Sequence, residues 1–131
     1  MPDRGLPPEL GSIAIVGSGQ VGTMLGLGLR EAGAEDVSLF DRDATVAHQS
    51  LERGAGHRTL ADVSRALRAD TVILALPIPA IVSFLDDHGR GFRPGCFVID
   101  TGSAKGRVVE AMRRAVPESV HAIGGHPVAG T

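Results

Sequence analysis

The chain has 131 residues, of which 18 are glycine and 8 are proline, so these two types fill about a fifth of it against about 12% on average. This length fits one domain, and 43% hydrophobic residues can fill one core, which argues against disorder and repeat arrays. A net charge of -2 lacks the basic surface that nucleic-acid binding needs. The longest apolar stretch, residues 71–82, contains two prolines and is shorter than the ~20 residues that cross a bilayer. We therefore expect a cytoplasmic protein with neither a nucleic-acid nor a membrane partner.

After an N-terminal arm that we expect to be flexible, residues 1–11, short β-branched or aliphatic runs alternate with longer segments of helical spacing. This alternation predicts an α/β domain with a mainly parallel sheet over residues 12–131. The expected strands are 13–16, 37–40, a brief one around 57–60, 71–76, 96–99 and 120–123. The expected helices are 21–31, 44–53, 62–67, 78–87 and 104–116, with a loop over 89–95. The single cysteine, Cys96, lies in an apolar run, which indicates a small core residue in a reducing compartment.

The strongest local motif is a G-x-G-x-x-G pattern between the first expected strand and the first expected helix. Its residues are Gly17, Ser18, Gly19, Gln20, Val21 and Gly22. The first glycine permits a tight turn, the second lets a pyrophosphate approach the backbone, and the third allows close packing of helix on strand. Gly26 shares the helix face of Gly22, which predicts a close approach there because a helical glycine costs about 1 kcal/mol relative to alanine. A glycine-rich turn without a ligand is the alternative.

An acidic residue follows the second expected strand. Asp41 lies close to the spacing of about 20 residues at which a carboxylate accepts hydrogen bonds from the adenosine ribose, and such a carboxylate repels a 2′-phosphate. We therefore favour NAD over NADP, although Arg42 could receive a phosphate or lie over the adenine, and Asp41 could be an ordinary turn residue. Leu76 and Pro77 end the fourth strand at the sheet edge where doubly wound folds bind ligands, and they are a candidate wall for the dinucleotide.

Two further segments follow expected strands. Residues 100–106 read Asp-Thr-Gly-Ser-Ala-Lys-Gly, and residues 124–130 read Gly-Gly-His-Pro-Val-Ala-Gly. A parallel sheet would bring Ser103, Lys105 and His126 to the edge of the glycine motif, where a histidine can act as a general base and a hydroxyl can orient it. We assign Thr101 to the cofactor site. Taken singly, the serine also fits a helix N-cap, the lysine a solvated residue and the histidine a turn. The other four histidines have no metal-ligand spacing, so we expect no metal.

Together these motifs resemble the nucleotide-binding half of prephenate or arogenate dehydrogenases, over about residues 12–131. The resemblance implies a Rossmann-type, doubly wound, mainly parallel sheet of about six strands. It implies NAD(P)-dependent oxidative decarboxylation of prephenate or arogenate in tyrosine biosynthesis. His126 would accept the hydroxyl proton of the substrate, Ser103 would hydrogen-bond that histidine, and Lys105 would lie near the site.

Members of this family continue after the Gly-Gly-His-Pro segment into a helical domain that completes the substrate pocket and forms a homodimer. This chain stops at Thr131, so we expect a dinucleotide-binding half that is inactive alone. Two other functions stay open. The chain could be a non-catalytic NAD-binding module, or it could belong to another hydroxy-acid or imine dehydrogenase of the same superfamily.

Overall fold

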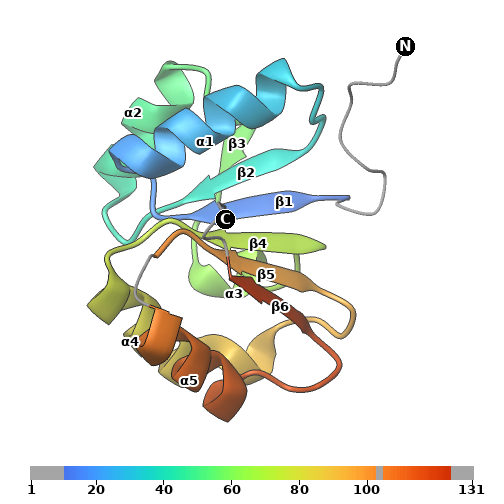
Figure 1. The fold of residues 1–131 in the computed structure, drawn as a ribbon. Coiled ribbons are helices and arrows are strands. Elements are labelled where there is room, and N and C mark those ends of the chain that lie inside the picture. The colour runs from blue at the N-terminus through green and yellow to red at the C-terminus, as the bar shows by residue number, and fades with distance from the viewer. Residues whose placement is uncertain (1–10, 103–104, 125–131) are drawn as a thin grey trace.

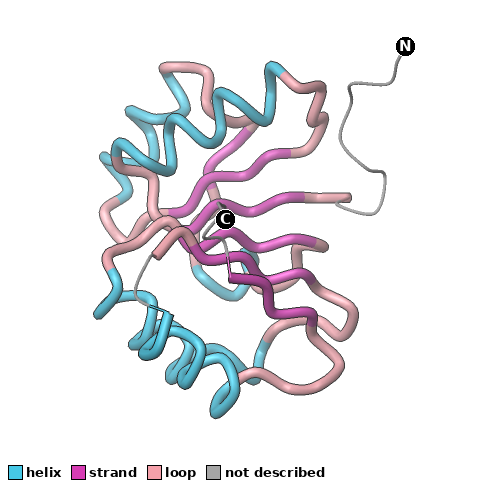
Figure 2. Tube along the Cα trace, in the orientation of Figure 1, coloured by secondary structure: helices cyan, strands magenta, loops and turns pink. Residues whose placement is uncertain are grey.

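The chain folds as one parallel sheet between two layers of helices (Figures 1 and 2). The computed structural model describes residues 11–102 and 105–124, so most of the predicted arm lies outside the described residues. The strands are β1 (Ile13–Val16), β2 (Val37–Phe40), β3 (Arg58–Thr59), β4 (Thr71–Leu74), β5 (Phe97–Asp100) and β6 (His121–Gly124). The helices are α1 (Gln20–Glu31), α2 (Ala44–Glu52), α3 (Val63–Ala66), α4 (Ile78–His88) and α5 (Lys105–Ala115), with a one-turn 3-10 helix, η2 (Gly89–Gly91). The strand order is β3-β2-β1-β4-β5-β6, with every pair parallel.

Every strand and helix expected from the sequence is present, but some boundaries were wrong. The last two predicted strands each begin one residue later than expected. The N–H groups of Cys96 and Val120 close turns onto Arg93 and Pro117, at 3.0 Å each, so ladder pairing starts only at the next residue. The fourth strand ends at Leu74 rather than residue 76, and the loop predicted over 89–95 begins with η2.

The two faces of the sheet bury separate aliphatic clusters. In Figure 1, α1 and α2 cover one face, and α4 and α5 cover the other together with α3. All four residues of β1 are at most 3% exposed, as expected for a central parallel strand covered on both faces. Ile13 and Ile15 belong to the cluster beneath α1 and α2, while Ala14 and Val16 belong to the larger cluster beneath α3, α4 and α5. Cys96 is buried, as predicted, and this burial raises the pKa of its thiol to about 11.

Helix α1 lies unusually close to its neighbours, as the two glycines on one face predicted. A Cβ atom at Gly26 would lie only 2.1 Å from the carbonyl oxygen of Ala55. No side chain larger than hydrogen fits there without moving backbone, so the cost of a helical glycine is offset by close packing.

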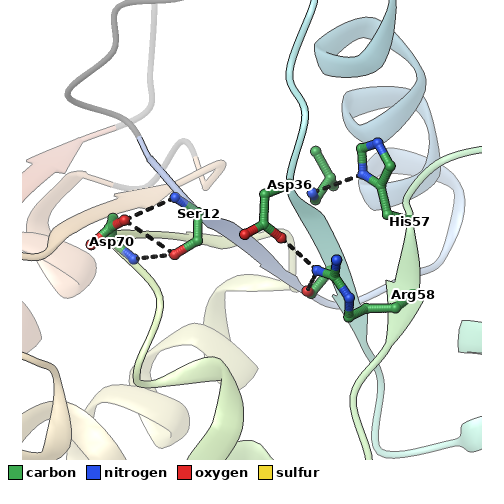
Figure 3. A network of polar contacts seen from close by, with 7 residues as sticks. Ser12, Asp36, His57, Arg58 and Asp70 are labelled. Atoms are coloured by element: carbon green, nitrogen blue, oxygen red, sulfur yellow. Dashed lines mark hydrogen bonds and ion pairs between the residues drawn. The ribbon is translucent and has the colours of Figure 1, made fainter.

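Polar contacts tie the strands together at the edge where they begin (Figure 3). The Ser12 backbone N–H donates to the Asp70 carboxylate at 2.9 Å, and the Asp70 N–H donates to the Ser12 hydroxyl at 2.9 Å. Arg93 forms an ion pair with the same carboxylate at 2.6 Å. Near β3, the Val37 N–H donates to Nδ1 of His57 at 3.0 Å. These contacts fix the amino edge of the sheet. Within the described ranges, no helix is long and apolar enough to cross a membrane.

Candidate dinucleotide-binding site

The site begins where the strands end. The register pairs Val16 with both Phe40 and Leu74, then Leu74 with Asp100, and Asp100 with Gly124. Five strands therefore end at the same level, and the segments that follow them leave from one edge. This is the edge at which open α/β sheets bind ligands.

The glycine motif forms the turn between β1 and α1. Gly17 has a φ of +97°, and a Cβ there would lie 2.3 Å from the Ala75 carbonyl oxygen. At Gly22 a Cβ would lie 1.9 Å from the carbonyl oxygen of Gly17. These contacts confirm the turn and packing roles predicted for the first and third glycines. At Gly19, by contrast, a Cβ would meet nothing within 4 Å.

Ser18, the residue between the first two glycines, forms a hydrogen bond through its N–H, its hydroxyl and its carbonyl. The Ser18 N–H donates to Asp41 at 2.9 Å, and its hydroxyl donates to the Phe40 carbonyl at 3.1 Å. Its own carbonyl accepts a hydrogen bond from the Thr23 hydroxyl at 3.1 Å. Ser18 is only 2% exposed, so its predicted part in cofactor binding would be to shape the turn rather than to offer its hydroxyl.

Asp41 links the turn to the end of β2. One carboxylate oxygen accepts the Ser18 N–H, and the other accepts the Asp43 N–H, both at 2.9 Å. Asp41 itself is half-buried. Since a carboxylate oxygen has two acceptor lone pairs, each oxygen can still accept one further hydrogen bond from a ligand hydroxyl.

A cavity of about 690 Å³ brings several predicted residues together. It is lined by Gly17, Asp41, Arg42, Leu76 and Pro77, with Val63 and one face of α4 along the length of that helix. A neighbouring cavity of about 680 Å³ shares Asp41 and Arg42 with it and extends toward β3. The volume and mixed lining suit a nucleoside moiety, because ligand pockets combine apolar walls with a few polar groups.

Other predicted residues lie apart from this cavity. Gln20 lines a smaller cavity of about 370 Å³ between α1 and α2, and Val21 is 56% exposed at the helix surface. Thr101 follows β5, and its hydroxyl donates to the Leu74 carbonyl at 3.2 Å. Ser103 and His126 lie outside the described residues, and of Lys105 only the backbone, at the start of α5, is described. The predicted reaction centre therefore stays a prediction.

Two residues of this region escaped the sequence reasoning. The buried hydroxyls of Thr23 on α1 and Ser50 on α2 lie 2.7 Å apart. A polar residue directly after the third glycine, on the helix face that the motif buries, was the available signal for Thr23. Ser50 had none, because its contact depends on how the two helices pack. Among residues 11–102 and 105–124, no cluster of potential metal ligands is found.

The arrangement fits a dinucleotide. The first three N–H groups of an α-helix have no acceptor within the helix, and in α1 they belong to Gln20, Val21 and Gly22, which follow Gly19 directly. A pyrophosphate could approach them there. The strand order, the glycine turn and an acid at the end of β2 together define a doubly wound dinucleotide-binding domain.

Comparison with known proteins narrows this class. A family profile described as prephenate dehydrogenase, nucleotide-binding domain, matches residues 25–131. Prephenate dehydrogenase from Lactococcus lactis subsp. cremoris is 31% identical over 121 residues, which cover 91% of this chain and 34% of the relative. The chain therefore belongs to the family of prephenate dehydrogenase nucleotide-binding domains.

Solved structures agree with this fold. Arogenate dehydrogenase from Synechocystis is 28% identical with a TM-score of 0.78, covering 92% of this chain and 42% of that one. Prephenate dehydrogenase from A. aeolicus, solved with hydroxyphenyl propionate and NAD+, has a TM-score of 0.79 at 22% identity, covering 92% of this chain and 43% of that one. The chain spans about a third of the length of the curated relatives and less than half of these solved chains.

Proposed function

We propose that this chain is the dinucleotide-binding half of an enzyme that oxidatively decarboxylates prephenate or arogenate with NAD+. The observation that carries the proposal is the glycine turn at the carboxyl edge of the sheet, which is open at its second glycine and bonded to the Asp41 carboxylate through the Ser18 N–H. Membership in the prephenate dehydrogenase family supports the substrate class.

The preference for NAD+ follows from the charge at the end of β2. The two oxygens of Asp41 would accept hydrogen bonds from the ribose hydroxyls, and the carboxylate would repel a 2′-phosphate at the same position. Its neighbour Arg42 is exposed and lines the same cavity, where its guanidinium plane could cover an adenine ring. In this geometry the carboxylate, fixed by two backbone N–H groups, decides between the two dinucleotides.

The bound dinucleotide would supply the hydride acceptor. His126 would take the hydroxyl proton of the substrate while the ring carbon bearing that hydroxyl loses its hydride. The electron pair of the breaking bond to the carboxylate then enters the ring, carbon dioxide leaves, and the proton returns to what becomes the phenolic oxygen. Ser103 would orient the histidine, and Lys105 would add positive charge near the carboxylates. The protein mainly has to place the ring and polarise the hydroxyl.

We also propose that the 131 residues bind the dinucleotide but turn over prephenate negligibly. The aligned region is a minority of each relative's length, so substrate-binding groups are expected in the remainder. The test is to follow NADH formation with prephenate, using the chain alone and with the remaining domain of a relative supplied in trans. Turnover by the chain alone at ordinary enzyme rates would contradict this proposal.

A His126→Ala variant tests the assigned base. It should bind NADH as the parent chain does, because the histidine is assigned to the substrate, and it should abolish any turnover restored in trans. Loss of NADH binding in this variant would contradict the general-base role.

A further inference from the structure

A buried pair of hydroxyl groups stands directly behind the glycine turn. Thr23 and Ser50 are each 2% exposed, and their hydroxyl oxygens lie 2.7 Å apart across the contact between α1 and α2. The Thr23 hydroxyl also lies 3.1 Å from the carbonyl oxygen of Ser18. Three polar groups from two helices and the turn therefore form one short chain of hydrogen bonds.

The direction of this chain follows from counting protons. The Ser18 carbonyl can only accept, so the single proton of the Thr23 hydroxyl must be donated to it. Thr23 then has no proton left for Ser50, and the contact between the two hydroxyls requires Ser50 to donate. The sequence of donation runs from Ser50 through Thr23 to the Ser18 carbonyl.

This donation fixes the peptide group between Ser18 and Gly19. The described peptide bonds are trans, and in a trans peptide the N–H points away from the C=O. Because the Ser18 carbonyl points inward to Thr23, the Gly19 N–H points the opposite way, away from Thr23. A Cβ at Gly19 would also meet nothing within 4 Å, so the turn is open at this residue. The N–H and hydroxyl of Ser18 are also bonded, to Asp41 and Phe40, which opposes rotation of this peptide.

We propose that Thr23 and Ser50 are positioning residues for the pyrophosphate of the dinucleotide. By donating to the Ser18 carbonyl, they hold the Gly19 N–H toward the phosphate and polarise the same peptide, which strengthens that N–H as a donor. This inference rests on the proposed dinucleotide-binding function and adds two side chains that act through the Ser18 carbonyl.

A purely structural role would look different. If the pair of hydroxyl groups served only to join α1 to α2, removing it would lower the stability of the fold. It would also reduce the affinity for every ligand of the site to the same extent. A positioning role acts through one peptide N–H, so it affects ligands with a pyrophosphate and leaves the adenosine moiety unaffected. Comparing ADP-ribose with adenosine separates the two roles.

The experiment titrates the full 131-residue chain with NADH, ADP-ribose and adenosine, using NADH fluorescence, calorimetry and ligand-observed NMR respectively. The Thr23→Val variant keeps the shape of the side chain and removes its hydroxyl. It should bind NADH and ADP-ribose about tenfold more weakly, with adenosine affinity unchanged. The Thr23→Ser variant keeps the hydroxyl and should restore the affinity. Thr45→Val, at an exposed position on α2, is the matched control and should bind all three ligands as the parent does.

Each outcome has a separate meaning. If the parent chain binds neither NADH nor ADP-ribose, the proposed function is wrong, and this inference is overturned with it. If the parent binds them and Thr23→Val binds them equally well, or loses adenosine to the same extent, only the positioning role is overturned. If Thr23→Val does not fold, the Ser50→Ala variant tests the inference instead. It keeps the hydrogen bond from Thr23 to the Ser18 carbonyl but removes the hydrogen bond that Ser50 donates to Thr23. For Ser50→Ala, a loss of about threefold for NADH and ADP-ribose with adenosine affinity unchanged supports the inference, and unchanged affinity for all three ligands overturns it.

Discussion

Adding one methyl group to the glycine turn should separate binding from folding. In Gly19→Ala the new Cβ meets nothing within 4 Å, and the residue has an extended backbone, with φ of -74° and ψ of -151°, that alanine adopts. Stability should therefore stay the same or rise by up to about 1 kcal/mol. The methyl group would occupy the space into which a phosphate must come to reach the neighbouring N–H groups.

The expected loss of affinity is large. A hydrogen bond from an N–H group to a charged acceptor contributes about 1.5–3 kcal/mol, and losing one such contact weakens binding by roughly 10- to 100-fold. The assay is a titration with NADH, followed by the nucleotide's own fluorescence, because the chain contains no tryptophan. Thermal unfolding of the same samples by circular dichroism reports stability.

Two other glycines of α1 are matched controls. At Gly28 a Cβ also meets nothing, so Gly28→Ala should keep the parent affinity and gain up to about 1 kcal/mol in stability. At Gly22 a Cβ would lie 1.9 Å from a carbonyl oxygen of the backbone, so Gly22→Ala should lower the free energy of unfolding by about 1–3 kcal/mol. If Gly19→Ala binds NADH as tightly as the parent, no phosphate lies against Gly19 and the binding geometry is wrong.

Three further predictions concern single side chains. Asp41→Ala should relax discrimination against NADP, seen as a smaller ratio of the dissociation constants of NADPH and NADH, and an unchanged ratio would refute the ribose assignment. The Ser12 N–H, helped by Arg93, holds the pKa of Asp70 below its ordinary 3.8, so this carboxylate stabilises the fold above pH 3.8 and the stabilisation is lost as pH falls through the lowered pKa. Urea unfolding at a series of pH values should show this loss of stability. If the Asp70→Asn variant loses as much stability as the parent over the same pH range, Asp70 is not its source. Burial raises the pKa of the Cys96 thiol to about 11, so alkylation at neutral pH should be slow in the folded chain and fast in denaturant, and equal rates would contradict its burial.

The sequence predicted the architecture well because the signals were local. A continuous apolar run such as residues 13–16 followed by a glycine motif determines a strand, a turn and a helix without reference to the rest of the chain. The strand boundaries at Cys96 and Val120 were missed because a turn hydrogen bond competes with the ladder for one N–H group. The hydrophobic periodicity of the sequence carries no information on which of these two hydrogen bonds forms.

The site was predictable only in part, for the same reason. Gly17, Gly22 and Asp41 follow from motif spacing, and the structure places the three at one turn. Motif spacing assigned Ser18 to the cofactor-binding turn but did not predict that its hydroxyl donates to the Phe40 carbonyl. The contact of Thr23 with Ser50 joins residues far apart in the chain, so it depends on the tertiary packing of two helices and leaves no trace in local spacing.

We propose that this nucleotide-binding domain selects NAD(H) over NADP(H). The most direct test is a pair of titrations of the 131-residue chain, one with NADH and one with NADPH, under the same buffer and salt conditions. We expect saturable binding of NADH at one site, with NADPH binding more weakly. Absence of saturable NADH binding by the folded chain, or tighter binding of NADPH, would contradict it.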